Sequence, residues 1–270
     1  MNNLQQRVVT AMALGTLILG SIHLGPIYQS IVFGVFMLVG TWEFYSLCNS
    51  IEHVKISKIT AVSLALIVYL FFIALCFKQI PLMAMTLLFP LFLSFTLMEL
   101  WKKNKAPLLN ISLLLMGIVY VSFPFFLCID LNLRNTESLS AVSVMFILIW
   151  TNDTMAYFVG KYFGKSLFFP RISPKKTWEG TLGGVVCTLL AGVILGLYMQ
   201  EENLWFWCVA SLLISVTAIL GDLMESLFKR SMQVKDSGKI LPGHGGILDR
   251  FDAALFSIPF FYCWYLLYFY

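Results

Sequence analysis

Charged residues are scarce in this sequence. Asp, Glu, Lys and Arg make up only 12% of the 270 residues, whereas 59% of the residues are hydrophobic. A soluble domain carries about a quarter charged residues, so the composition excludes an ordinary soluble protein and predicts an integral membrane protein. The net charge of +4 gives no indication of nucleic-acid binding, and we expect no nucleic-acid partner.

Paired cysteine motifs and linkers are also missing. The six cysteines are scattered singly through apolar runs, with no CxxC or Cys/His metal spacing. We therefore interpret all six as small hydrophobic core residues. The sequence also has no Pro/Ser-rich linker, no low-complexity tract and no clear internal repeat.

Long apolar runs dominate the chain. A membrane span needs roughly 20 apolar residues, and such runs predict an all-α, polytopic protein with about nine transmembrane helices. Pro26 separates the first two runs, which we interpret as two spans, with a re-entrant hairpin as the alternative. We expect the first run to be a true span and not a cleaved signal peptide. The runs lie at about 8–24, 27–48, 57–77, 81–100, 108–131, 139–160, 178–199, 204–228 and 251–270.

The basic residues fix the expected orientation. With nine spans, one side holds only Lys78 and Arg134. The positive-inside rule then places the N-terminus and the polar loops 161–177 and 229–250 in the cytoplasm, and the C-terminus outside. The cytoplasmic side carries Arg7, Lys55, Lys58, Lys102, Lys103, Lys105, Lys161, Lys165, Arg171, Lys175, Lys176, Lys229, Arg230, Lys235, Lys239 and Arg250.

Polar residues divide the chain into three expected regions. Residues 1–107 form an N-terminal transmembrane region, 108–177 a middle transmembrane region with a cytoplasmic loop, and 178–270 a C-terminal transmembrane catalytic region. Glu43 is the exception in the first region. It is either a buried, hydrogen-bonded brace between helices or a member of the functional site.

Span six and the loop after it carry candidate site residues. Asp153 and Tyr157 are four residues apart and share a helix face, either in the site or as an internal brace. Ser173-Pro174 predicts a helix start, with Ser173 as the cap and Pro174 at the first helical position. Lys175 and Lys176 would then lie in the first turn and bind phosphate. The alternative is an ordinary basic flank of a span.

Glycines recur at multiples of four along span seven. Such a stripe of small residues allows helices to approach closely. We therefore assign it to packing and not to catalysis. The stripe consists of Gly180, Gly184, Gly192 and Gly196.

Carboxylates gather at the ends of the last two spans. Asp222, Glu225 and Lys229 share one helix face, and Asp249 and Asp252 are three residues apart. Converging carboxylates predict an oxygen-rich Mg²⁺ site. We expect the metal ligands to be Asp222, Asp249 and Asp252. The alternative is a structural salt-bridge cluster with Lys229, Arg230 and Arg250.

A glycine-rich loop joins these carboxylates. Lys235-Asp236-Ser237-Gly238-Lys239 is followed by Pro242-Gly243-His244-Gly245-Gly246. Glycine lets the backbone approach a ligand and present N–H groups to phosphate oxygens. His244 has three open roles: a proton donor, a hydrogen-bond donor to phosphate, or a loop brace.

The stretch from Ser226 to Asp252 resembles the signature of the phosphatidate cytidylyltransferases, the CDP-diacylglycerol synthases. The segments Ser173–Gly180 and Asp153–Gly160 are similar to other motifs of that family, and the resemblance covers roughly the C-terminal half. Met155 departs from the smaller residue that many members have. The matching elements are Ser226, Lys229-Arg230, Lys235-Asp236, Gly238, Pro242, His244-Gly245-Gly246, Asp249-Arg250 and Asp252.

The resemblance implies an enzyme that transfers CMP from CTP to phosphatidic acid. It implies Mg²⁺ as the cofactor and leaves open a second metal ion or an added monovalent cation. It also suggests a homodimer, and we expect a bacterial inner (cell) membrane. The expected catalytic residues are Asp222, Lys229, Lys235, Asp236, His244, Asp249 and Asp252. CTP and phosphate are expected to contact Ser173, Lys175, Lys176, Lys239, Gly245, Gly246 and Arg250. Asp153, Tyr157 and Glu225 form a second tier.

Two other functions compete with this interpretation. A CTP-dependent lipid kinase would transfer the γ-phosphoryl group and release CDP. An ion-coupled transporter would carry polar residues near the membrane midplane, often in inverted repeats. Here the polar residues cluster at the cytoplasmic ends of the spans, which disfavours a transporter.

Overall fold

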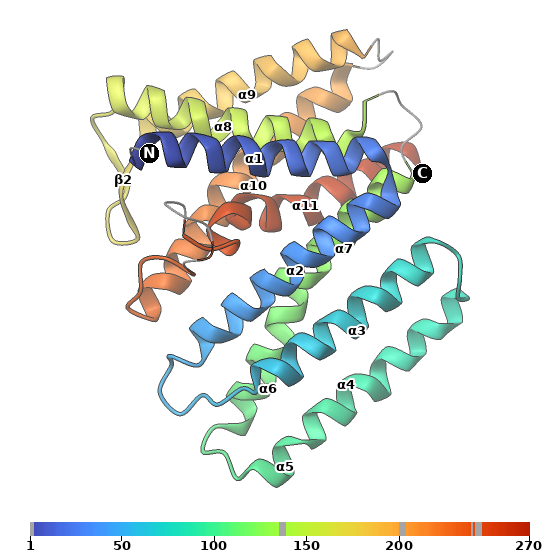
Figure 1. The fold of residues 1–270 in the computed structure, drawn as a ribbon. Coiled ribbons are helices and arrows are strands. Elements are labelled where there is room, and N and C mark those ends of the chain that lie inside the picture. The colour runs from blue at the N-terminus through green and yellow to red at the C-terminus, as the bar shows by residue number, and fades with distance from the viewer. Residues whose placement is uncertain (1–2, 135–138, 200–203, 239, 241–244) are drawn as a thin grey trace. The chain divides into compact units, whose positions relative to one another are not determined.

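The computed structural model describes residues 3–134, 139–199, 204–238, 240 and 245–270. The described residues are almost entirely helical, and Figure 1 shows their arrangement along the chain. The first part contains α1 (Asn3–Leu24), α2 (Pro26–Cys48), α3 (Lys58–Cys76), η1 (Leu82–Leu87), α4 (Leu88–Leu97), α5 (Glu99–Lys102), α6 (Pro107–Gly117), η2 (Ile118–Ser122) and α7 (Phe123–Arg134). It is followed by α8 (Ala141–Phe163), β1 (Leu167–Phe169), β2 (Ser173–Thr177), α9 (Trp178–Tyr198), α10 (Leu204–Ser231) and α11 (Leu248–Phe269).

The expected number of spans is confirmed. Within the described residues, 8 helical segments are long and apolar enough to cross a membrane, and Val8–Leu24 of α1 adds a shorter apolar helix. Two of the long segments are composite: Leu82–Lys102 joins η1, α4 and α5, and Pro107–Arg134 joins α6, η2 and α7. Pro26 begins α2, where its missing N–H costs nothing. The chain is a polytopic, all-α integral membrane protein.

The helices group into two compact units. The first unit contains residues 1–133 and 236–249, and the second contains 134–235 and 250–270. The chain therefore enters the first unit again late in the sequence, through the glycine-rich loop. The division into three sequence regions remains a prediction.

The first unit is built around α2, which packs against α1, α3, α6 and η2. Gln29 on α2 is fully buried; its amide donates to the Cys128 carbonyl at 3.2 Å and accepts from Asn132 at 2.8 Å. Tyr45, also buried, donates to the Leu114 carbonyl at 2.7 Å. These bonds satisfy polar groups that hydrocarbon would otherwise leave unpaired. They tie α2 to the composite span Pro107–Arg134.

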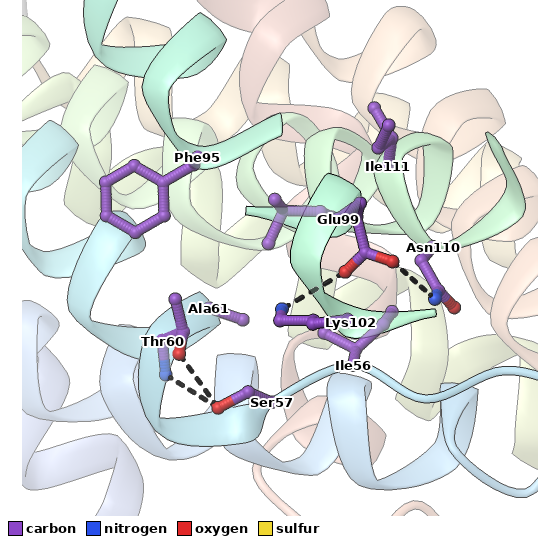
Figure 2. Close-up of a pocket in the computed structure, with 10 residues that line it drawn as sticks. Ile56, Ser57, Thr60, Ala61, Phe95, Glu99, Lys102, Asn110 and Ile111 are labelled. Carbon is purple, nitrogen blue, oxygen red and sulfur yellow. Dashed lines mark hydrogen bonds and ion pairs between the residues drawn. The ribbon is translucent and has the colours of Figure 1, made fainter. Parts of the chain in front are cut away.

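A small pocket in the first unit lies among α3, α5 and α6 (Figure 2). Glu99 is its main polar group and accepts from Lys102 at 3.1 Å and from Asn110 at 3.0 Å. Asn110 in turn accepts from the Lys55 backbone N–H at 3.1 Å. These bonds occupy the Glu99 carboxylate within its own unit.

In the second unit, α9 packs against both α8 and α10. The predicted glycine stripe is confirmed as packing, because Gly180, Gly184, Gly192 and Gly196 are all buried. An added Cβ at Gly184 would lie 2.9 Å from Asn152 Oδ1 on α8. One at Gly192 would lie 2.6 Å from Ser211 Oγ on α10. The stripe therefore serves two different neighbours, one at each end of α9.

The expected helix start at Ser173-Pro174 is wrong. Ser173–Thr177 is strand β2, paired antiparallel with β1, and α9 begins at Trp178. Thr177 is the actual cap, since its hydroxyl accepts from the Gly180 N–H at 3.2 Å. Glu179 then accepts from the backbone N–H groups of Lys165 and Ser166. These contacts hold the chain before α9 as a hairpin.

The cysteines are all free, as expected for isolated residues. Cys48 and Cys128 are buried, whereas Cys263 is exposed on α11. The expectation of a uniform core role is therefore wrong for Cys263. A thiol that behaves as a small hydrophobe is equally at home on an apolar helix surface.

Candidate functional site

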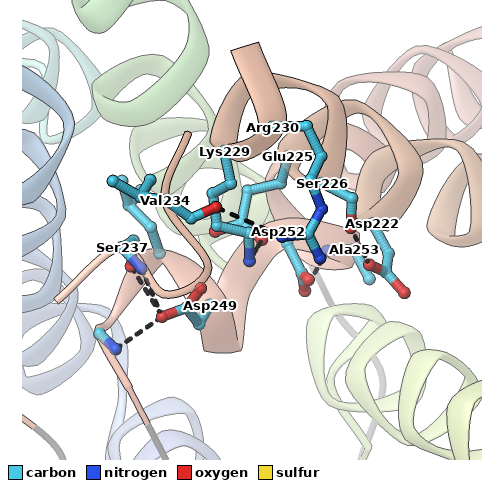
Figure 3. Close-up of polar contacts among 12 residues, drawn as sticks. Asp222, Glu225, Ser226, Lys229, Arg230, Val234, Ser237, Asp249, Asp252 and Ala253 are labelled. Atoms are coloured by element: carbon cyan, nitrogen blue, oxygen red, sulfur yellow. Dashed lines mark hydrogen bonds and ion pairs between the residues drawn. The ribbon is translucent and has the colours of Figure 1, made fainter. Parts of the chain in front are cut away.

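The predicted site residues fall into two clusters, one in each unit. Figure 3 shows part of each: Asp222, Glu225, Lys229 and Asp252 of one cluster, and the contact between Ser237 and Asp249 of the other. We call the first the carboxylate–lysine cluster; it belongs to the second unit and consists of Lys176, Asp222, Glu225, Lys229 and Asp252. We call the second the loop cluster; it belongs to the first unit and consists of Glu43, Ser237, Gly246, Leu248 and Asp249.

Two ion pairs organise the carboxylate–lysine cluster. Lys176 Nζ on β2 lies 2.6 Å from Asp222 Oδ2 on α10, and Lys229 Nζ lies 2.7 Å from Glu225 Oε2 one helical turn earlier. The Glu225 and Lys229 side chains are only 5% and 13% exposed, so solvent screens this pair little. The helix face that Asp222, Glu225 and Lys229 are predicted to share therefore carries both negative and positive side chains.

Asp252 joins this cluster from α11, three residues after Asp249. It lies close enough to Asp222, Glu225 and Asp153 for repulsion between like charges. The helices approach closely because Gly221 has no side chain: an added Cβ there would lie 2.6 Å from the Asp252 carbonyl oxygen. A set of neighbouring carboxylates of this kind gains stability from a bound cation.

The loop cluster concentrates hydrogen bonds on Asp249. Its Oδ2 accepts from the Ser237 N–H at 2.9 Å, the Ser237 hydroxyl at 3.0 Å and the Gly246 N–H at 2.8 Å. Because Asp249 lies in the first turn of α11, its carboxylate also complements the positive end of the helix dipole. The Gly246 N–H is therefore engaged within the loop, although the sequence predicted that it binds phosphate.

Glu43 completes the loop cluster from α2. Its Oε2 accepts from the Leu248 N–H at 3.0 Å and from the Ser237 hydroxyl at 3.4 Å. The sequence left Glu43 open as either a brace or a site residue. It assigned no role to Ser237 or to the Leu248 N–H. The only available signal was a glutamate in an otherwise apolar span.

The glycines of the loop make room for these carboxylates. A Cβ on Gly238 would collide with Glu43, and one on Gly246 would collide with both Ser237 and Glu43. Gly245 has a φ of +80°, and a Cβ there would collide with Asp249. Glycine is required at these positions to close the backbone around Glu43 and Asp249.

The remaining predicted residues are more open. Lys235, Asp236 and Arg250 are exposed, and Lys175 is exposed on β2 beside the half-buried Ser173. Asp153 and Tyr157 are both exposed on α8, and their role as site residues stays a prediction. Lys239 and His244 lie outside the described residues.

The donor chemistry of the carboxylate–lysine cluster fits magnesium. In the described part of the chain, no group of three or more His, Cys, Asp or Glu side chains is arranged to hold a metal ion. Magnesium, however, is usually held by one or two carboxylates together with water and substrate phosphates. Asp222 and Asp252 supply such a pair.

The comparison with known families decides the relationship. A model described as "Cytidylyltransferase family" matches residues 5–268. The chain belongs to the cytidylyltransferase family. The match reaches through the N-terminal helices, whereas the sequence motifs alone covered roughly the C-terminal half.

The relatives of the chain include proteins from staphylococci. Proteins named phosphatidate cytidylyltransferase from Staphylococcus epidermidis RP62A and Staphylococcus saprophyticus are each 39% identical to the chain over 168 residues. The protein of that name from Staphylococcus aureus COL is 41% identical over 169 residues. Each similarity covers 62% of the chain and 62% of the relative.

Proposed function

We propose that this protein is a CTP:phosphatidate cytidylyltransferase, which converts CTP and phosphatidic acid to CDP-diacylglycerol and pyrophosphate for phospholipid synthesis. The observation that carries the proposal is the carboxylate–lysine cluster inside a chain matched to the cytidylyltransferase family over residues 5–268. The names of the staphylococcal relatives supply the substrate class.

The chemistry explains why charges of both signs meet at this site. An oxygen of the phosphatidate phosphate attacks the α-phosphorus of CTP, the bond to the β-phosphate breaks, and pyrophosphate leaves. Both reactants are anions, so the main tasks are neutralising charge and holding the groups in line. A phosphate monoester oxygen is already largely ionised near neutral pH, so no strong general base is needed.

Five lysines have proposed tasks in the reaction. Lys175 and Lys176 bind the triphosphate or the lipid phosphate from β2, and Lys176 exchanges its contact with Asp222 for a phosphate oxygen. Lys229, Lys235 and Lys239 stabilise the departing pyrophosphate. The exposure of Lys175 and Lys235 leaves both of them accessible to a water-soluble nucleotide.

On the sequence pattern, Asp222, Asp249 and Asp252 are the proposed magnesium ligands; Asp222 and Asp252 belong to the carboxylate–lysine cluster of the second unit, and Asp249 belongs to the loop cluster of the first. Magnesium, when bound, supplies positive charge to the phosphate oxygens and favours departure of the leaving group. Asp249 is held in one orientation by its three hydrogen bonds, and Asp252 accepts from the Ala253 N–H at 2.7 Å. A titration of the protein with Mg²⁺ distinguishes one bound cation from two.

The bilayer provides one substrate and the cytoplasm the other. We propose a bacterial inner (cell) membrane, with the N-terminus and the site on the cytoplasmic side and the C-terminus outside. The distribution of lysine and arginine supports this orientation, and the staphylococcal relatives support a bacterial setting. A homodimer is a further proposal, which rests on the family resemblance.

Isotope-labelled CTP tests the proposal. The purified protein is given phosphatidate in detergent, Mg²⁺ and CTP labelled at the α-phosphate, and the label is followed by lipid extraction. The expected result is label in the lipid phase together with pyrophosphate in water. Label that stays in water as CDP, while the lipid gains an unlabelled phosphate, would instead identify a lipid kinase.

A further inference from the structure

We propose that Glu43, on the second helix of the chain, is a positioning residue for the cytidylyl transfer: it holds the glycine-rich loop so that Asp249 is presented in one orientation. The inference rests on the proposed function and assigns a task in it to the N-terminal helices. The sequence motifs of the family resemblance contain no residue from this part of the chain.

The hydrogen bonds of Glu43 reach Ser237 in the glycine-rich loop and Leu248 at the N-terminus of α11, where that loop ends. Its Oε2 accepts from the Leu248 N–H at 3.0 Å and from the Ser237 hydroxyl at 3.4 Å, across separations of 205 and 194 residues. Gln29, by contrast, bonds to Cys128 and Asn132 within the body of α7, as a brace between two packed helices does. Glu43 and Gln29, both on α2, therefore have different tasks.

Ser237 couples Glu43 to Asp249. The single proton of the Ser237 hydroxyl is shared between Asp249 Oδ2 at 3.0 Å and Glu43 Oε2 at 3.4 Å, and the Ser237 N–H also donates to Asp249. Leu248, which donates to Glu43, directly precedes Asp249 in the chain. Glu43 therefore fixes the backbone on one side of Asp249 and the hydroxyl that contacts its carboxylate.

The burial of Glu43 requires a reason beyond packing. Its side chain is only 3% exposed, and its Oε1 has no hydrogen-bond partner among the described residues. A buried carboxylate with an unsatisfied oxygen is costly. The loop is nevertheless shaped around it, because Gly238 and Gly246 leave no space for a side chain beside Glu43. Such a cost is typical of groups kept for function.

The test uses Glu43→Ala, with the shorter Glu43→Asp as a second variant should the alanine form fail to fold. Hydrogen exchange of the amides in residues 236–249 is measured first, on the full-length protein without substrate. Loss of the Glu43 acceptor should make the Ser237 and Leu248 amides exchange about 10-fold faster or more. Peptides from the rest of α2 should keep their wild-type exchange.

The kinetic test separates positioning from stability. Removing a residue that orients a site group typically lowers activity by about 10- to 100-fold. We expect this loss in kcat, with a smaller change in the KM for CTP. Gln29→Met is the matched control: it alters another buried, hydrogen-bonded polar side chain of α2, one whose partners lie on α7. It should lower the melting temperature by a similar amount and leave kcat and loop exchange unchanged.

The outcomes distinguish this inference from the proposed function. Unchanged loop exchange in the Glu43 variants, or a kcat loss no larger than that of Gln29→Met at an equal drop in melting temperature, would overturn the role of Glu43. A wild-type protein that transfers no cytidylyl group would overturn the reaction, while faster exchange in the variants would still establish the loop contact. Both effects together support the proposal.

Discussion

Asp249 shows what single residues contribute to this site. Three donors converge on one of its oxygens at 2.8 to 3.0 Å. Hydrogen bonds to an ionised acceptor are stronger than neutral ones and fix the orientation of the carboxylate. A carboxylate held in this way loses little entropy when it receives a cation or a phosphate-bound metal.

The first residue-scale prediction concerns this charge. Asp249→Asn keeps the size of the side chain but removes its negative charge. We expect turnover to fall by about 10- to 100-fold or more, while membrane insertion and detergent extraction stay normal. Cytidylyl transfer and the size-exclusion profile are measured on the same preparation. Wild-type turnover in a normally folded variant would remove Asp249 from the metal site.

The second residue-scale prediction concerns space. Gly246→Ala would press a methyl group against Ser237 and Glu43. Overpacking of this kind costs about 1–3 kcal/mol, so we expect a lower melting temperature and lost turnover. Gly20→Ala is the control, because a Cβ there meets nothing within 4 Å, and a helical alanine is favoured over glycine. Equal melting temperatures for the two variants would contradict the crowding at Gly246.

At the scale of elements, the β1–β2 hairpin and α9 are joined by hydrogen bonds and together position Lys176. The β1–β2 hairpin is bound to the first turn of α9 through Glu179, which accepts from the Lys165 and Ser166 N–H groups. It carries Lys176 to the Asp222 carboxylate on α10. The glycine stripe of α9 then sets how closely α8 and α10 approach that helix.

The element-scale prediction tests this stripe. Gly184→Leu places a large side chain where a Cβ alone would lie 2.9 Å from Asn152 Oδ1. We expect the variant to melt at a clearly lower temperature in detergent, because helix packing of small residues cannot accommodate it. Leu190→Ala, at a 59% exposed position of α9, should have little effect. A larger loss from Leu190→Ala would contradict the packing role of the stripe.

The same elements show how much the sequence could predict. Hydropathy located all the spans, because each needs a long apolar run, and helical spacing correctly placed the stripe and the Glu225–Lys229 pair. The Ser173-Pro174 cap failed because a local signal was outweighed by strand pairing and by Thr177 as the cap. The contacts of Glu43 could not be predicted, since its partners lie about 200 residues away in the chain and no local pattern encodes such a pairing.

At the scale of the whole molecule, the distribution of basic residues predicts the topology. Gln79→Cys and Glu52→Cys, each introduced after removal of the native cysteines, place a thiol in the loops on either side of α3, and both positions are exposed. We expect an impermeant maleimide to label Gln79→Cys in intact cells and to leave Glu52→Cys unlabelled until the membrane is opened. The reverse pattern would invert the orientation and place the site outside.

The central claim is that this membrane protein joins CMP from CTP to a lipid phosphate. The most direct measurement quantifies both products after CTP is added to protein reconstituted in phosphatidate-containing vesicles with Mg²⁺. The account predicts CDP-diacylglycerol and pyrophosphate in equal amounts, and neither product after Mg²⁺ is chelated. CTP consumption that releases CDP and leaves no cytidine in the lipid, or no CTP consumption at all, would contradict it.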